Sequence, residues 1–389
     1  MSQFTCLMPQ GIQFGSGKAV ELARSTKGKN VLFMCDPGVK SSGIADSIIK
    51  AVRAEAASFA EFCEIPAEPT EQQVTDIVAS VDNPAVDVVL ALGGGSAMDL
   101  AKFVSVMIQG GPSMEDLFSG KLPEKRKTAL YMVPTTAGTG SEATPNAIVL
   151  RPALNLKVGV VCEAFMPDRV VLDPDLLLSL PAHITAATGM DALCHALECY
   201  VSNKANPISD MFALESMRLT FKSLRKAHAD GKNSETRGDT LLAAFFGGVC
   251  IASSGTNIVH ALSYPLGGRY RIPHGVSNAV LLAAAFACNK DSCEDKLAIV
   301  AELAAKAAGK SLDGMTVSQK ADYLINFLAE LSRDLDIPGS LEELGVGAKD
   351  LDLLVDAAFE VKRLLNNNPK PLTKEDIRGV YASILTRKA

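Results

Sequence analysis

The chain has 389 residues, enough for two hydrophobic cores, and its 48% hydrophobic and 21% charged residues exclude a disordered or fibrous protein. A net charge of −6, with no run of Lys or Arg longer than three residues, argues against nucleic acid as a partner. There is no secretory signal, no apolar run long enough to cross a bilayer and no paired spacing among the nine cysteines, so we expect a cytoplasmic protein that is not bound to a membrane.

The first half of the chain alternates between short apolar runs and segments with helical spacing. Each apolar run leads into a turn that contains Gly, Pro or Thr. The predicted strands are residues 30–35, 86–92 and 128–133, and the predicted helices are residues 42–57, 71–81 and 97–109. Repetition of strand, turn and helix implies a mostly parallel, Rossmann-like sheet with helices on its faces.

Asp36 follows the first predicted strand and begins an Asp-Pro-Gly sequence. A carboxylate at this point is placed to accept hydrogen bonds from the ribose of an adenosine, and it would repel a 2′-phosphate. This interpretation favours NAD over NADP. A plain turn without any ligand explains the same three residues equally well.

Three glycines, Gly93, Gly94 and Gly95, end the second predicted strand, and Ser96 follows them. Glycines let a ligand approach the backbone closely, and the free N–H groups at the start of the next helix favour a phosphate. The alternative is a well-capped helix without a ligand, with Ser96 as the N-cap and Asp99 completing a capping box. The turn is not the Gly-x-Gly-x-x-Gly of a Rossmann fingerprint.

A second polar turn follows the third predicted strand. Thr135, Thr136, Thr139 and Ser141 lie within seven residues of one another, together with two glycines. Hydroxyls and free amides at the carboxyl edge of a parallel sheet are typical of a nucleotide site, whereas a polar surface loop is the alternative. Two such turns in one half of the chain favour nucleotide binding.

The pattern changes near residue 180, beyond which almost every segment has helical spacing. The predicted helices are residues 184–201, 207–225, 237–254, 257–264, 274–288, 292–307 and 317–335, followed by a C-terminal set. We therefore expect an α/β nucleotide-binding domain over residues 1–180 and an all-helical domain over residues 181–389.

Four polar residues interrupt the apolar helices of the second half. Asp191 and His195 are four apart, which places both on one face of a helix. His260 and His274 are separated by Pro265, Gly267 and Gly268, and a tight turn there could bring both rings to one point. One carboxylate and three imidazoles suit Fe²⁺ or Zn²⁺ with a position left for a substrate. The alternative for any single one is a hydrogen-bonded core residue.

The sequence resembles the iron-dependent (group III) alcohol dehydrogenases over essentially its whole length. Three blocks carry the resemblance: GGGSAMDLAK from Gly93, PTTAGTGSE from Pro134, and the pair GMDALCHALE and HALSYPLGGRYRIPHG in the helical half. The resemblance implies an architecture shared with dehydroquinate synthase. An N-terminal α/β domain binds NAD or NADP, an all-helical domain binds Fe²⁺ or Zn²⁺, and the active site lies in the cleft between them.

The resemblance also assigns residues by position. The implied metal ligands are Asp191, His195, His260 and His274. The implied pyrophosphate loop is Gly94, Gly95 and Ser96, with Asp36 near the adenosine ribose. Further positions that line the nucleotide site in the family are Asp99, Thr135, Thr136, Thr139, Ser141 and Lys157.

Two positions depart from the family pattern. Many members carry a second histidine four residues after the third ligand, often linked to proton transfer, and Tyr264 stands there in this chain. The proton could leave through Tyr264, through water or through the cofactor ribose. Many members also have Asn-Pro-Thr ahead of the helix at residue 71, where this chain has Glu68-Pro69-Thr70, so a cofactor contact from that Asn is not expected here.

We therefore expect a metal-dependent enzyme that moves a hydride between NAD, or NADP, and a small primary alcohol, diol or aldehyde, and that forms a homo-oligomer. The sequence does not identify the substrate. Three alternatives stay open: a metal-independent reductase of the same fold that resembles maleylacetate reductase, a lyase that resembles dehydroquinate synthase, and a helical binding module with a structural metal. Retention of Asp191 argues against the first. The scarcity of basic residues near the ligands argues against the second, and the two polar turns argue against the third.

Overall fold

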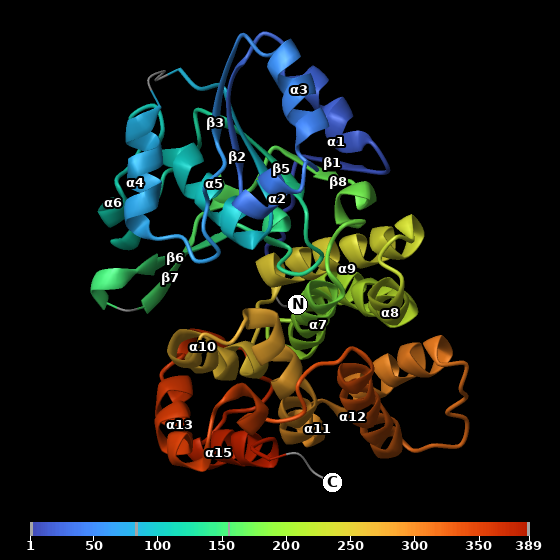
Figure 1. Ribbon diagram of the computed structural model, residues 1–389. Coiled ribbons are helices and arrows are strands. Elements are labelled where there is room, and N and C mark those ends of the chain that lie inside the picture. The colour runs from blue at the N-terminus through green and yellow to red at the C-terminus, as the bar shows by residue number, and fades with distance from the viewer. Residues whose placement is uncertain (1–2, 82–84, 155, 387–389) are drawn as a thin grey trace. The chain divides into compact units, whose positions relative to one another are not determined.

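The computed structural model describes residues 3–81, 85–154 and 156–386. The chain divides into two compact units, one of residues 7–179 and one that combines the residues up to Cys6 with those from Leu180 onward. The first unit is built on a parallel sheet and the second is helical (Figure 1). The predicted fold class is thereby confirmed.

The α/β unit contains a six-stranded sheet in the order β1-β8-β5-β4-β2-β3, in which every neighbouring pair is parallel. Its strands are β1 (Gly11–Phe14), β2 (Asn30–Cys35), β3 (Ser58–Phe62), β4 (Val88–Gly93), β5 (Ala129–Pro134) and β8 (Arg169–Leu172). The three predicted strands are its central members β2, β4 and β5. Because β4 and β5 are neighbours with Gly93 opposite Pro134, the two polar turns leave the sheet side by side.

Helices pack on both faces of this sheet, with α1 and α3 on one side and α4, α5 and α6 on the other (Figure 1). The helices are α1 (Lys18–Glu21), α2 (Pro37–Ser41), α3 (Asp46–Glu55), α4 (Glu71–Ser80), α5 (Gly95–Met107) and α6 (Met114–Phe118). The predicted helix over residues 42–57 is shorter than expected, because the chain passes through Gly43 at a φ of 74° before α3 begins. An antiparallel hairpin of β6 (Asn146–Arg151) and β7 (Leu156–Val161) was not predicted.

The helical unit is organised around α7 (Ala182–Val201), in which every residue from 189 to 201 is buried. The other helices are α8 (Pro207–Ala229), α9 (Ser234–Ser253), α10 (Ile258–Tyr270), α11 (His274–Ala307), α12 (Val317–Asp334), α13 (Leu351–Phe359), α14 (Lys362–Leu365) and α15 (Lys374–Ser383). The predicted break between residues 288 and 292 is only a kink inside α11, at Cys293. Since α7 is apolar on all sides, its few polar residues are held inside a core.

The turn between His260 and His274 differs from the prediction. The helix α10 continues through Pro265 and ends only at Tyr270, so Pro265, Gly267 and Gly268 are helical. Proline costs a helix one hydrogen bond, here that of the Ala261 carbonyl, and burial of α10 outweighs this loss. The actual turn is Arg271, which has a φ of 54°, followed by Ile272 and Pro273.

Among the described residues, no single helix is long and apolar enough to cross a membrane. The pair α9 and α10 meets a length and composition test only when both are taken together, with a bend of 104° between them. Many residues of both helices are buried in the core of the helical unit.

Candidate metal centre and nucleotide-binding loops

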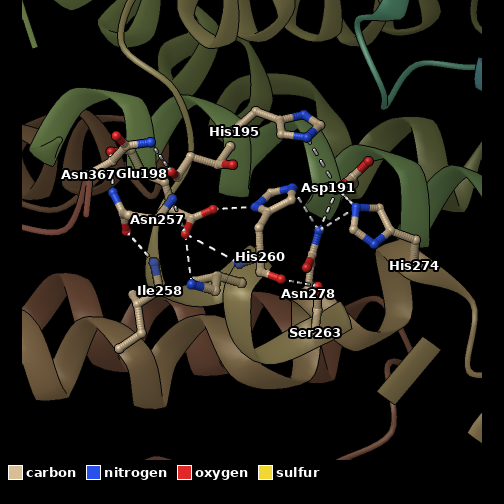
Figure 2. Close-up of polar contacts among 12 residues, drawn as sticks. Asp191, His195, Glu198, Asn257, Ile258, His260, Ser263, His274, Asn278 and Asn367 are labelled. Carbon is tan, nitrogen blue, oxygen red and sulfur yellow. Dashed lines mark hydrogen bonds and ion pairs between the residues drawn. The ribbon is translucent and has the colours of Figure 1, made fainter. Parts of the chain in front are cut away.

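Three helices bring the four predicted ligand residues to one point (Figure 2). Asp191 and His195 lie one turn apart on α7, His260 lies in the first turn of α10, and His274 is the first residue of α11. The Nε2 atoms of His195, His260 and His274 lie 3.6, 3.7 and 3.7 Å from the same carboxylate oxygen, Oδ1 of Asp191. The carboxylate oxygen is thus nearly equidistant from the three imidazole nitrogens.

These separations fit a cation. Four ligand atoms arranged as a tetrahedron around a metal at about 2.1 Å would lie about 3.4 Å from one another. Ligand atoms of Asp191, His195 and His260 all lie within 4.8 Å of one another, and all three residues are buried. The His274 side chain is 42% exposed and so forms the open side of the group. One carboxylate and three imidazoles are a suitable set for Fe²⁺ or Zn²⁺.

The neighbouring side chains of the ligand group stabilise the ionised form of Asp191. Burial alone would raise the pKa of Asp191, but the three neighbouring histidines and Asn278 lower it below its ordinary value. Asp191 therefore stays ionised inside an apolar helix, and an ionised carboxylate is the form that binds a metal.

Glu198 is a residue of this centre that sequence reasoning missed. Its carboxylate is fully buried, accepts the backbone N–H groups of Asn257, Val259 and His260, and hydrogen bonds to Nδ1 of His260. With Nδ1 engaged, Nε2 of His260 presents its lone pair toward Asp191. Burial lowers the pKa of His260, but the charge and hydrogen bond of Glu198 together with the charge of Asp191 outweigh burial and raise the pKa. The signal was present, because Asp191, His195 and Glu198 lie on one face of α7.

Asn278 is a second missed residue. It lies one turn after His274 on α11 and is fully buried. Its Nδ2 lies 2.7 Å from Oδ1 of Asp191 and 3.2 Å from Nε2 of both His260 and His274 (Figure 2).

Tyr264 lies one turn after His260 on α10, with its ring centroid 6.2 Å from that of His274. The residue is 37% exposed. Burial of its hydroxyl raises the pKa of Tyr264, and the charge of Arg363, with a hydrogen bond from it, partly offsets the rise. The tyrosine therefore lies beside the open side of the ligand group.

The first polar turn forms the start of α5. The N-cap is Gly94, and no side chain caps the helix, so the interpretation of Ser96 and Asp99 as a capping box is wrong. Ser96 lies within the helix and its hydroxyl bonds to the Ala67 carbonyl. A helix that begins on two glycines leaves its first N–H groups available to an anion.

The second polar turn packs directly on the first. The Thr135 N–H bonds to the Gly93 carbonyl at 3.0 Å. A Cβ added to Gly95 would lie 2.8 Å from Cγ2 of Thr139, and one added to Gly94 would lie 3.5 Å from the Thr136 side chain. Glycine is therefore needed at position 95 for this close packing against Thr139, whereas a Cβ at position 94 would meet only an ordinary contact.

Asp99 and Ser141 bind each other rather than pointing away from the protein. Oδ1 of Asp99 accepts the Ser141 hydroxyl at 2.6 Å, and Oδ2 accepts the Ile148 N–H at 3.1 Å. The fully buried Lys102 donates to the Ser141 carbonyl at 2.7 Å and to the Thr144 hydroxyl at 3.1 Å. Burial lowers the pKa of Lys102 to about 8. Lys102, which sequence reasoning missed, therefore fastens the second turn to α5.

The two remaining predicted contacts lie at the edges of this region. One oxygen of Asp36 caps α2 by accepting the Val39 N–H at 2.8 Å, so the Asp-Pro-Gly sequence begins a short helix rather than a plain turn, and the other oxygen lies beside Gly93. The Asp36 carboxylate is therefore close to the first polar turn. Lys157 lies on β7 and forms an exposed ion pair with Glu68 at 2.7 Å.

Comparison with known proteins places both halves of the chain in one family. Residues 9–174 match the family model of iron-containing alcohol dehydrogenase, and residues 185–385 match the C-terminal model of the Fe-containing alcohol dehydrogenase family. The NAD-dependent methanol dehydrogenase of Bacillus methanolicus is 31% identical over 97% of this chain and 99% of its own. Long-chain-alcohol dehydrogenase 1 of Geobacillus thermodenitrificans is 34% identical over 98% and 96%.

Solved structures agree with this result. A 1,3-propanediol oxidoreductase matches with a TM-score of 0.92 at 30% identity, covering 99% of this chain and 100% of its own. The sulfoacetaldehyde reductase of Bifidobacterium kashiwanohense, solved in complex with NAD⁺, matches with a TM-score of 0.88 at 27% identity and covers 100% of both chains. The chain belongs to the iron-containing alcohol dehydrogenase family.

Proposed function

We propose that this protein is a metal-dependent, NAD-linked oxidoreductase that interconverts a small primary alcohol or diol and its aldehyde. The observation that carries the proposal is the convergence of three imidazole Nε2 atoms on one carboxylate oxygen at 3.6–3.7 Å. Relatives named for methanol, long-chain alcohol and 1,3-propanediol support alcohols and diols as the substrate class.

The helical unit would hold the cation through Asp191, His195, His260 and His274. When bound, the cation would polarise the substrate oxygen as a Lewis acid, and NAD would carry the hydride. Burial of Asp191, His195 and His260 excludes water from one side of the group, whereas the exposed His274 leaves the other side accessible. Glu198 fixes the ring of His260 in the tautomer that can bind a metal.

The α/β unit would bind NAD at the edge where β4 and β5 end. The start of α5, at Gly94, Gly95 and Ser96, would receive the pyrophosphate, with Thr135, Thr136 and Thr139 beside it. The second oxygen of Asp36 would accept the ribose hydroxyls and disfavour the 2′-phosphate of NADP. Asp99, Ser141 and Lys102 would act indirectly, by holding the second turn in place.

Tyr264 is our proposed route for the substrate proton, because it lies beside His274 at the open side of the group. We further propose that the enzyme works in the cytoplasm as a homo-oligomer, without nucleic acid or membrane as a partner. The nine free cysteines suit a reducing compartment.

The matched pair of variants His260→Ala and His183→Ala tests the metal-dependent function. His260→Ala should lower alcohol oxidation by at least about a thousandfold and remove the bound metal, while NADH binding, followed by fluorescence, persists. His183→Ala, an exposed histidine on α7, should behave as wild type. Full activity of chelator-treated His260→Ala protein would instead favour the metal-independent reductase.

A further inference from the structure

The side-chain amide of Asn278 is in direct contact with the proposed metal-ligand atoms. It lies 2.7 Å from a carboxylate oxygen and 3.2 Å from two imidazole nitrogens, and all three atoms are ligands in the proposed function. An amide NH₂ has two hydrogens, so it cannot satisfy three acceptors at once. The amide therefore stands from three ligand atoms at separations similar to those between two ligands of one cation.

The other end of the same amide has no partner. Among the described residues none donates a hydrogen bond to Oδ1 of Asn278, although the side chain is fully buried. A buried amide oxygen without a donor costs free energy, of a size that folded proteins avoid unless the atom has another use. A metal ion is one such use, because amide oxygens are ordinary ligands of divalent cations.

We propose that Asn278 is a fifth protein ligand of the metal and that its amide turns over when the metal binds. Without metal, Nδ2 donates to Asp191 and holds the carboxylate near His260 and His274. A cation repels an NH₂ group and attracts a carbonyl oxygen, so rotation about the Cβ–Cγ bond exchanges the two and presents Oδ1 to the metal. The exchange needs no movement of α11, because the two ends of an amide have nearly the same size.

This inference rests on the proposed function, since it requires the four ligands to bind a metal. The inference adds a ligand whose amide group has opposite orientations in the metal-free and the metal-bound protein. In the metal-free protein the amide stabilises the ligand group, and in the loaded protein it supplies one more oxygen to the cation.

Three variants of the full chain test the proposal: Asn278→Leu, Asn278→Asp and, as a matched control one residue away on the same buried helix, Ser277→Ala. The metal alone is the probe. Dissociation constants for Zn²⁺ and Co²⁺ are measured by competition with a chelator, and the visible absorption of bound Co²⁺ reports the coordination number. The melting temperature of each protein is measured with and without metal.

Asn278→Leu should weaken metal binding by about 10- to 100-fold and give the stronger Co²⁺ absorption of a lower coordination number. Asn278→Asp should bind metal at least as tightly as wild type, yet melt at a lower temperature without metal, because two carboxylates would then face each other beside Asp191. Ser277→Ala should match wild type. If Asn278→Leu does not fold, Asn278→Asp is sufficient as a test, because its metal affinity is expected to be retained or to rise while its melting temperature without metal falls.

Wild-type affinity and an unchanged Co²⁺ spectrum in Asn278→Leu would overturn the proposal. So would equal losses of affinity in Asn278→Leu and Asn278→Asp, which a merely structural role predicts. Either result in a protein that still binds metal and oxidises alcohol leaves the proposed function intact. Failure of the wild-type protein to bind metal would instead refute that function.

Discussion

The two proposed sites of this protein are built from different parts of the chain. The metal centre uses side chains, since Asp191, His195, His260 and His274 are brought together from three helices. The nucleotide-binding edge uses mainly backbone, because α5 begins on glycines and its first N–H groups carry no side-chain cap. A single substitution of a ligand can therefore abolish metal binding. Nucleotide binding, in contrast, is changed chiefly by substitutions that alter the distance between the two polar turns.

The sharpest test of this contrast within the metal centre is Glu198→Gln. The variant keeps the size of the side chain but removes the charge that holds the His260 ring, so we expect metal affinity to fall by about 10- to 100-fold. Chelator competition measures the change. Glu215→Gln, a glutamate on α8 whose side chain is 42% exposed, is the control and should bind metal as wild type does.

Unchanged metal affinity in Glu198→Gln would show that the ring of His260 is held by packing alone. The proposed ligand set would survive that result, but the dependence of the centre on a buried carboxylate would not.

The second prediction concerns the support of the nucleotide edge. Burial raises the pKa of Glu142, next to Ser141, to about 7 from its ordinary 4.5. The folded protein then holds this proton more tightly than the unfolded chain, so the free energy of unfolding falls as the pH rises from 4.5 to 7. The loss should be about 3 kcal/mol. Urea unfolding at a series of pH values measures it.

Glu142→Gln should remove this part of the pH dependence, because its side chain does not ionise. Glu124→Gln, an exposed position in the same unit, should leave the slope as it is in wild type. An equal slope in wild type and Glu142→Gln would mean that the pKa of Glu142 is the same in the folded and unfolded protein.

The smallest expected effect tests the backbone character of the nucleotide edge. In Gly95→Ala the new Cβ would lie 2.8 Å from Cγ2 of Thr139, so the two loops must separate. We expect the KM for NADH to rise about tenfold, or about 1.4 kcal/mol, while metal content stays unchanged. Steady-state kinetics and metal analysis measure the two properties.

Two further variants check the cause. Gly159→Ala, whose Cβ would meet only an ordinary contact at 3.6 Å, should leave the KM at the wild-type value. Thr139→Ser removes Cγ2 and should partly restore NADH binding in the Gly95→Ala background. A KM that stays high in the double variant would point to the start of α5 itself rather than to its contact with the second turn.

The predictable parts of the fold were those with strong local patterns. The strand β2 was predicted to the residue, because its six residues are mostly buried and a turn follows at once. β1, β3 and β8 were missed, since β1 and β3 are largely exposed and β1 and β8 have only four residues each. Such strands exist because neighbours pair with them, which no local pattern records.

The candidate metal centre was predicted better than its surroundings. The four ligand residues are rare polar residues in apolar helices, so their spacing was informative. Glu198 and Asn278 lie on the same helix faces, but Glu and Asn are common residues, and their roles follow from contacts with α10 and α7. The helix through Pro265 was missed because tertiary burial overrides the rule that proline ends a helix.

The hydrogen bonds between Glu198 and the first turn of α10 affect which metal the enzyme binds in a cell. Glu198 forms four hydrogen bonds with the start of α10, one of them with the His260 ring, so the ring does not adapt its position to suit one ion over another. A rigid, nitrogen-rich group binds first-row cations in the order of their intrinsic affinities, in which Zn²⁺ exceeds Fe²⁺. Occupancy by iron would then reflect supply during synthesis, and the same gene expressed in zinc-rich medium should yield zinc-loaded protein.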